Sequence, residues 1–225
     1  QTTTFYEAES GARVWEAPDD LRVLAWLPGL ASFVYAARDG VVMIADGLTG
    51  TASEHPVAVR NSAYGTYVPG GEERALLGVA HALNLVEHRR TEQGITATDI
   101  AQFRIDSGHG ITSRDPVPMR SGKLVVFKSV RDIGWINLER GTSGVWETSA
   151  LRTLNFAKLD ETHLLITSVE QDRVTTRTWS FDIVEGTLAP VDTGGHRGLI
   201  VDIGHRVGFM LRGEEAWFGD EVAAG

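Results

Sequence analysis

The residues best suited to chemistry in this sequence are its seven histidines, and their spacing limits what they could do. No two of them have the H-E-x-x-H spacing of a helical zinc motif. His81 and His88 are an odd number of residues apart, so on one extended strand they would lie on opposite faces and could not share a metal. His196 and His205 flank a strand that contains Asp202, and these three could form a His/carboxylate metal cluster. The alternative is two loop histidines at the ends of one strand, and the sequence favours it, so we predict no metal and no cofactor.

No other catalytic motif points to particular residues of this sequence. The sequence contains no G-x-S-x-G elbow, Walker loop or dinucleotide fingerprint. A glycoside hydrolase needs a pair of carboxylates across a cleft, and thirty acidic residues do not select one pair. The absence of cysteine excludes disulfides, thiol nucleophiles and Cys-ligated zinc. We therefore predict no catalytic residue, and a binding protein is favoured over an enzyme.

Composition restricts the partners. Thirty acidic and twenty-one basic residues give a formal charge of -9 with no long block of one sign, which disfavours binding to phosphate backbones. No apolar run approaches the roughly 20 residues of a membrane-spanning helix. The sequence begins at Gln1 without methionine, which we interpret as either the end left by signal-peptide removal, hence export, or a trimmed end.

An alternating apolar stretch, a turn with glycine and a second extended stretch recur along the chain, a pattern typical of β-hairpins. The five occurrences are Thr4–Pro18, Val42–Pro56, Gln102–Pro116, Trp135–Ser149 and Ser180–Gly194. Five units over 225 residues average 45 residues each, inside the about 40 to 50 residues typical of a four-stranded repeat unit.

Further apolar stretches between the hairpins complete each unit. In the last third they are 151–157, 163–169 and 174–183, followed by 198–203, 207–211 and 216–218. The final unit stops one strand short. We expect Thr2–Glu7 to pair beside Ala216–Gly219, which would close the array and remove its exposed edges.

One segment fits two structures. Residues 72–86 have an acidic first turn and good helix formers, which is compatible with a helix. The preferred alternative is a long strand over 75–90 that turns at Thr91–Gly94 into a strand over 95–105.

The segments Trp135–Trp146 and Val41–Gly50 carry a family resemblance. In the first, a hydrophobic strand meets a Thr-x-Gly turn and then a Trp, which resembles the quinoprotein-type and related β-propeller repeats. The second, with Leu48-Thr49-Gly50, resembles it too. No repeated Trp-Asp dipeptide, Asp-box or kelch double glycine is present. The resemblance implies an all-β fold: one propeller domain over residues 1–225, with about five four-stranded antiparallel blades closed by the N-terminal strand.

The same resemblance implies where a ligand would bind. The innermost strands of propellers line a central channel, so polar residues on those strands are the candidates for ligand contact. They are Arg60, Asn61, Arg120, Asn155, Asp202 and His205. The alternative is that they face water in the channel and have no role.

Six tryptophans could form packing contacts or platforms for sugars and proteins. Trp15 and Trp146 occupy equivalent places in their hairpins, as do Trp135, Trp179 and Trp217. Equivalent places favour repeated packing between blades.

Two functions follow from these patterns. The first is a non-enzymatic interaction module, a rigid scaffold that presents loops to a protein or glycan partner. The second is a propeller hydrolase or lyase that acts on a sugar, lactone or peptide with acid/base residues at the channel mouth. The sequence favours the first.

Overall fold

The computed structural model describes most of the chain as β-strands. The described residues are 3–6, 11, 13–17, 21–57, 64–106, 110–112, 116–129, 132–148, 152–169, 176–191, 199–202, 207–210 and 216–218. Among them the only helix is a single 3-10 turn, η1 (Pro28–Leu30). No helix in this part of the chain is long and apolar enough to cross a membrane.

Four antiparallel sheets of four strands follow one another along the chain, and in each the strands are adjacent in chain order. Sheet B contains β3 (Arg22–Leu27), β4 (Ser32–Ala36), β5 (Val42–Asp46) and β6 (Thr51–Glu54). Sheet C contains β7 (Tyr64–Val68), β8 (Glu73–Val79), β9 (Ala82–Thr91) and β10 (Gly94–Arg104). Sheet D contains β11 (Val117–Met119), β12 (Leu124–Lys128), β13 (Ile133–Asn137) and β14 (Thr142–Trp146). Sheet E contains β15 (Arg152–Lys158), β16 (His163–Val169), β17 (Thr176–Asp182) and β18 (Thr187–Pro190).

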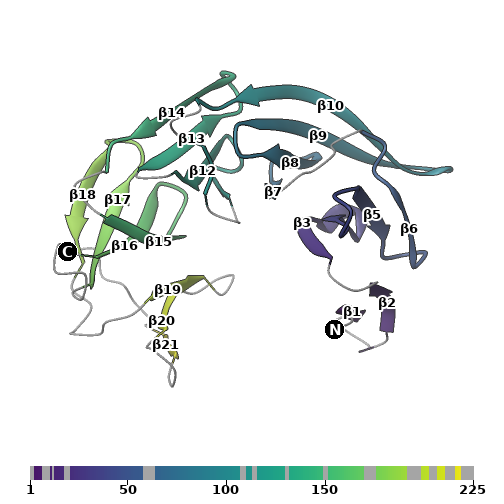
Figure 1. Ribbon diagram of the computed structural model, residues 1–225, viewed down its shortest axis with the longest axis horizontal. Helices are drawn as coiled ribbons and strands as arrows, with labels where there is room; N and C mark the ends of the chain where they lie inside the picture. The colour runs from purple at the N-terminus through teal and green to yellow at the C-terminus, as the bar shows by residue number, and fades with distance from the viewer. Residues whose placement is uncertain are drawn as a thin grey trace.

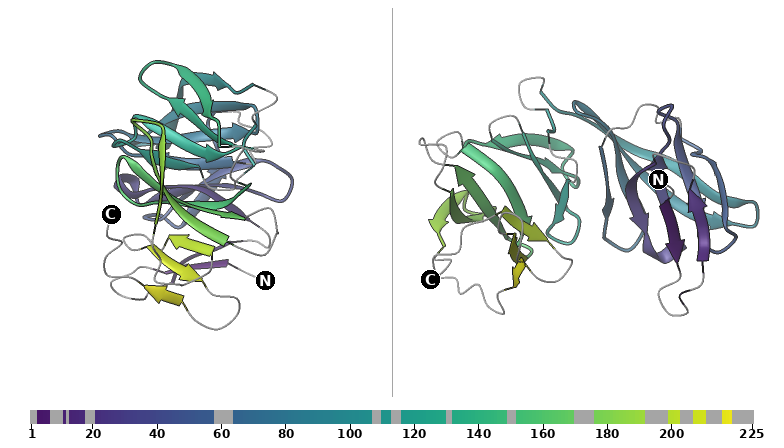
Figure 2. Two further views of the ribbon diagram at one scale, coloured as in Figure 1. Left: turned by 90° about the vertical axis from the view of Figure 1, so that its left-hand side faces the viewer. Right: turned by 60° about the horizontal axis from the view of Figure 1, so that its bottom comes forward.

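Two smaller sheets lie at the ends of this series. Sheet A pairs β1 (Thr3–Tyr6) with β2 (Arg13–Ala17), and sheet F contains β19 (Leu199–Asp202), β20 (Val207–Met210) and β21 (Ala216–Phe218). The sheets follow one another around an open arc, with sheets A and F at its two ends (Figure 1). The two further views show each sheet standing beside the next (Figure 2).

The turn between the third and fourth strands is the clearest repeat in the structure. It has the sequence D-G-L-T-G-T at Asp46, N-L-E-R-G-T at Asn137 and D-I-V-E-G-T at Asp182. In each, the fourth residue after the Asp or Asn is a glycine with φ of +67 to +68° whose N–H donates to the carbonyl of that Asp or Asn. The Asp or Asn side chain accepts a backbone N–H two residues on, which locks the turn.

Apolar side chains fill the space between neighbouring sheets. One cluster joins sheets B and C through residues such as Leu24, Val34 and Leu77. A second joins sheets C and D, and a third joins D and E around Phe181. Sheets C and D are therefore each held by apolar packing against two neighbours, as in other repeat proteins.

Most of the predicted strands are confirmed. The hairpins predicted in Thr4–Pro18, Val42–Pro56, Trp135–Ser149 and Ser180–Gly194 are β1–β2, β5–β6, β13–β14 and β17–β18. The strands predicted in the last third are β15 to β17 and β19 to β21.

Three expectations need correction or are not shown. The hairpin predicted in Gln102–Pro116 is wrong, because β10 is the edge strand of sheet C and pairs only with the preceding strand β9 among the described strands, and the described residues 105–106 and 110–112 are not strand. The helix compatible with residues 72–86 does not form. In place of the single long strand that we preferred for residues 75–90, the structure has two paired strands, β8 and β9. The turn from β9 into β10 lies where it was predicted. Closure of the array is not shown, since β1 pairs with β2 and lies at the opposite end of the arc from β21 (Figure 1).

Candidate functional site on the inner strands and their turns

The first strand of each sheet lies on the inner side of the arc. β3 neighbours β7, β7 neighbours β11, β11 neighbours β15, and β15 neighbours β19. This agrees with the expectation that the first strands form an inner lining.

The six predicted ligand-binding residues are only partly described. Arg60, Asn61 and His205 lie outside the described residues, as does His196 of the alternative metal cluster. Asp202 ends β19, and only its backbone is described.

The remaining two candidates are exposed on neighbouring inner elements. Asn155 lies on β15 at an irregularity of the pairing, and its Oδ1 accepts the N–H of Phe156 at 2.9 Å. Arg120 lies in the turn after β11. The structure therefore places these two residues on adjacent sheets, D and E.

The turn that carries Arg120 has an unusual backbone. Arg120 and Ser121 have φ of 51° and 53°, and the Gly122 N–H donates to the Met119 carbonyl at 3.1 Å. The only other described non-glycine residue with positive φ is Ala31. It ends η1, which is also a turn between the first and second strands of its sheet. A left-handed backbone conformation at non-glycine residues persists only where neighbouring groups enforce it, and it often marks functional sites.

Neighbouring turns enforce this conformation. A carboxylate oxygen of Glu161, in the turn after β15, accepts the Ser121 N–H at 2.6 Å. Burial raises the pKa of Glu161, but bonds from Lys158 and Ser121 outweigh it and leave that pKa below its usual value. On the other side, a Cβ at Gly122 would lie 1.9 Å from the Pro69 carbonyl oxygen. The inner turns of sheets C, D and E are thus in direct contact.

The outer turns lie at the same end of the molecule as these inner turns. In an antiparallel sheet of four strands in chain order, the first and third turns share one end. We call this end the turn face. It carries η1, the strained turn at Arg120 and the outer turns after β5, β13 and β17.

A histidine between two carboxylates also lies on the turn face. His163 Nδ1 is 3.0 Å from an oxygen of Asp160, and its Nε2 is 3.7 Å from an oxygen of Asp182. Asp160 also accepts the N–H groups of Thr162 and His163, and Asp182 accepts those of Val184 and Glu185. Both carboxylates therefore act as turn caps. Among the described residues no group of three metal-ligating side chains could hold a metal ion.

A second histidine contact is buried between sheets B and C. His55 Nε2 and His88 Nε2 are 2.8 Å apart, and the two residues are 4% and 1% exposed. His88 Nδ1 lies 3.3 Å from the Glu73 carbonyl, which can only accept, so we assign Nδ1 as the donor there. His88 Nε2 is then an acceptor. For the neutral His55 ring to donate from Nε2, its Nδ1 must accept the Val57 N–H at 3.3 Å and cannot also donate to the Val57 carbonyl 3.0 Å away. The two uncharged rings thereby link the two sheets.

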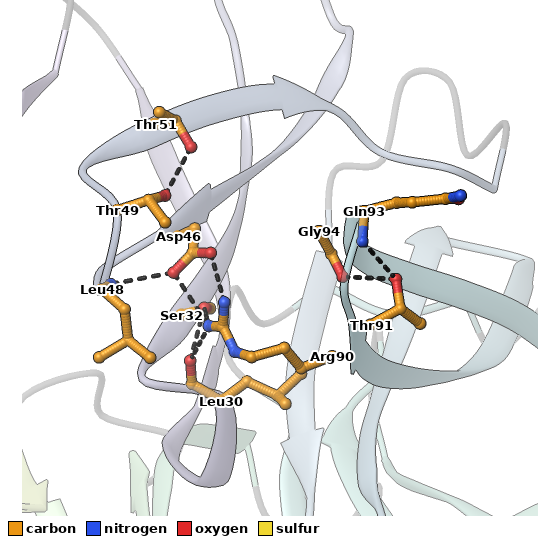
Figure 3. A network of polar contacts seen from close by, with 10 residues as sticks. All are labelled: Leu30, Ser32, Asp46, Leu48, Thr49, Thr51, Arg90, Thr91, Gln93 and Gly94. Carbon is orange, nitrogen blue, oxygen red and sulfur yellow. Dashed lines mark hydrogen bonds and ion pairs between the residues drawn. The ribbon is translucent and has the colours of Figure 1, made fainter.

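An ion pair continues the same contact toward the turn face. The Arg90 guanidinium donates to both oxygens of Asp46 at 2.5 and 2.9 Å and to the Leu30 carbonyl at 2.8 Å (Figure 3). The bond from Arg90 is the main cause that lowers the pKa of Asp46 to about 2. Sequence analysis missed both contacts, because their partners are 33 and 44 residues apart.

Comparisons with known proteins agree on the fold. No family model and no curated protein sequence matches the chain. Many solved structures resemble it, and three of them follow. The WD40 domain of SCAP from fission yeast has a TM-score of 0.62 at 9% identity, over 92% of this chain and 57% of that one. The β-propeller domain of Cps50 (Swd1) from Myceliophteria thermophila has a TM-score of 0.50 at 12% identity, over 96% and 78%. TolB from Acinetobacter baumannii has a TM-score of 0.52 at 14% identity, over 93% and 56%.

At such identities the likeness shows the fold alone. The chain is a β-propeller repeat protein, and its four-stranded antiparallel sheets are propeller blades. It spans little more than half the length of the SCAP and TolB structures.

Proposed function

We propose that the protein is a non-enzymatic scaffold that binds a protein partner through its turn face. The observation that carries this proposal is the exposure of large apolar side chains at the tips of two locked turns. Leu48 is 69% exposed in the outer turn of sheet B, and Val184 is 57% exposed in the outer turn of sheet E.

These two residues occupy the same position in their turns. Leu48 donates its N–H to Asp46 Oδ1 at 2.9 Å, and Val184 donates its N–H to Asp182 Oδ1 at 2.8 Å. Turn tips are usually polar, so an apolar side chain there is available for contact with another protein. Because the turns are already fixed, little conformational entropy is lost when a partner binds.

Other observations support a scaffold over an enzyme. The polar groups at the strained inner turn bind backbone atoms of adjacent blades. The carboxylates around His163 cap turns. The structural neighbours include a WD40 domain, and the likeness to them supports a rigid body that presents loops.

The experiment is affinity capture from the native source under mild conditions, followed by identification of the bound proteins. The variant changes Leu48 and Val184 together to Asp. The matched control is Val79→Asp, since Val79 is 39% exposed at the end of β8, opposite the turn face. We expect the double variant to lose a partner that the wild type and the control both retain. Monomeric recovery without a partner, or equal capture by the double variant, would overturn the proposal.

A further inference from the structure

The fourth strands of the blades differ greatly in length. β6, β14 and β18 have 4, 5 and 4 residues, whereas β10 has 11. Each is the outermost strand of its sheet, with one edge that no other strand of the sheet covers. Natural proteins shorten or interrupt such edges, because unpaired N–H and C=O groups accept further strands. β6, β14 and β18 follow this rule, and β10 does not.

The composition of β10 offers little protection either. Its sequence, GITATDIAQFR, contains no proline and no lysine, and its charged residues are Asp99 and Arg104. By contrast, β18 ends on Pro190. Among the described strands β10 pairs only with β9. An irregularity of the pairing between Asp99 and Ala101 divides the strand, which leaves Gly94–Asp99 as a regular edge segment. Six residues is the usual length of a strand in a sheet.

The edge segment is held firmly in place. β9 and β10 extend past β8 as a two-stranded ribbon, because β8 pairs with β9 only as far as His88. Ile95 and Ala97 pack against the cluster between sheets B and C, while Thr96 and Thr98 are exposed. Figures 1 and 2 show this ribbon reaching over sheet B at the outer side of the arc. The segment therefore presents its backbone groups from a rigid support.

We propose that Gly94–Asp99 binds an extended segment of a partner protein, which adds to sheet C as a fifth strand beside β10. Backbone hydrogen bonds supply the affinity in this mode of recognition, and alternate side chains supply the specificity. Asp99 is exposed at the end of the segment, and the whole chain carries a charge of -9. The partner segment therefore carries a lysine or arginine opposite Asp99, and we expect β-branched residues in it because they favour the extended strand that it must form. A second copy of this chain would bring another charge of -9, which opposes self-association. The segment begins at the turn face, since the β9–β10 turn is the third turn of sheet C, but it includes neither Leu48 nor Val184, and the inference does not rest on those two residues.

The probes are synthetic peptides of about six residues, the length of an ordinary strand. One alternates Thr and Val around a single Lys, one replaces that Lys with Glu, and one keeps the Lys but carries N-methyl groups at alternate amides. Amide hydrogen exchange of the wild-type protein reports binding at each residue. We expect the Lys peptide to slow exchange in Gly94–Asp99 and the N-methylated peptide to have no effect. The Lys peptide should bind about two- to fivefold more tightly than the Glu peptide, as is usual for opposite-charge pairs across strands.

Reversing the charge of residue 99 then tests whether the Lys of the bound peptide lies opposite Asp99. Asp99→Lys is expected to invert the preference between the Lys and Glu peptides. Glu185→Lys, which makes the same charge change on sheet E, is the matched control and leaves the preference as it was. Because Asp99 is exposed, the variant should keep the wild-type melting temperature. Unchanged exchange in Gly94–Asp99, equal binding of the N-methylated peptide, or a preference that Asp99→Lys does not invert would each overturn the inference. Since Leu48 and Val184 are intact in every arm, these outcomes leave the proposed role of the turn face untouched.

Discussion

The joint between sheets B and C and the joint between sheets D and E both contain a buried apolar cluster, but the side chains beside that cluster differ. In the B–C joint, one face of β9 carries Val86, His88 and Arg90 in succession. Val86 lies in the apolar cluster, His88 contacts His55, and Arg90 contacts Asp46. The contacts therefore become steadily more polar from the core to the turn face.

In the D–E joint the equivalent space is filled by aromatic rings. Trp146 packs edge-on against Phe181 with ring centroids 5.3 Å apart, and Trp135 lies 5.9 Å from Trp146. Trp179 also packs on this cluster, and its indole N–H donates to the Ser168 hydroxyl at 2.9 Å. The prediction that tryptophans pack between blades is thus confirmed for these three. Trp26 is different, since it is 50% exposed beside Phe33.

The comparison shows that neighbouring blades can be held in the same arrangement by different kinds of side-chain contact. A joint of aromatic rings depends on buried area, which pH and salt hardly change. A joint of histidines and an ion pair depends on protonation and screening. The two joints should therefore respond to different perturbations.

The largest effect is expected in the D–E joint for Phe181→Ala. Phe181 is 1% exposed and lies at the centre of the aromatic cluster, so truncation leaves a cavity. We expect a loss of about 3 to 5 kcal/mol in the free energy of unfolding, measured by denaturant titration at neutral pH. The control is Leu188→Ala on β18, a residue 36% exposed, which should cost far less. A similar loss for both variants would show that Phe181 does not hold the joint.

The next effect is a pH dependence that belongs to the B–C joint. Burial, followed by the nearby His55, lowers the pKa of His88 to about 4, and burial also lowers the pKa of His55. The unfolded chain therefore binds protons near pH 6.5, while the folded pair does not. The contribution of the uncharged pair to the free energy of unfolding is fully present above pH 6.5 and is lost as the pH falls toward about 4.

Charged groups near the pair do not compensate for its protonation. They are Glu73 on β8, Arg90 on β9 itself, Asp99 on β10, and Asp46 and Glu54 on sheet B. Asp46 and Arg90 pair with each other, and Glu54 and Asp99 are exposed. For His88 alone, the lowered pKa corresponds to a loss of roughly 3 kcal/mol in the free energy of unfolding as the pH falls to about 4. The measurement is the free energy of unfolding from pH 7 to pH 4 for the wild type and for a variant with both His55 and His88 changed to Leu. The variant should lose much of the slope in this range, and an identical slope would contradict the assignment.

A smaller effect is expected for the ion pair at the edge of the same joint. Arg90→Gln removes two bonds to Asp46 from a guanidinium whose side chain is 31% exposed. We expect a cost of about 1 to 2 kcal/mol, since bonds to charged groups contribute this much when partly shielded from water. A double-mutant cycle with Asp46→Asn measures the coupling, which should shrink as salt is added. Coupling that is zero at low salt would mean that the pair adds nothing to the joint.

The sequence was a good guide to the blades and a poor one to the contacts between them. Hairpins depend on local signals, namely alternation and a glycine in the turn, so four of the five were placed correctly. The third was misplaced because the turn of β9 and β10 is capped by Thr91 and lacks the Gly-Thr pair of the other full blades. The glycines within Gln102–Pro116 were interpreted as a hairpin turn, but one of them, Gly110, lies against His81, and a Cβ there would be 2.2 Å from a carbon of the His81 ring.

The contacts between blades carry no local signal. Nothing in the residues around His55 or His88 indicates that the two rings meet, because the register of two separate sheets decides it. The inner lining by the first strands could be predicted from the fold resemblance, but Arg120, expected on such a strand, lies in the turn after β11. The strained backbone at Arg120 could not be predicted, since it depends on Glu161 and Pro69 from the neighbouring blades.

The smallest effect concerns a feature that both joints share, the repeated outer turn. Gly50 of sheet B and Gly141 of sheet D have φ of +68° and +67°. Ala at either position must adopt the left-handed region, which costs an L-residue about 1 to 2 kcal/mol. A Cβ at Gly141 meets no atom within 4 Å, so the cost there comes from the backbone alone. We therefore expect Gly50→Ala and Gly141→Ala to lower the free energy of unfolding by similar amounts. Gly141→Asn should cost less, because Asn adopts this region more easily. Unequal losses at Gly50 and Gly141 would show that the adjacent joint, and not the turn itself, sets the cost.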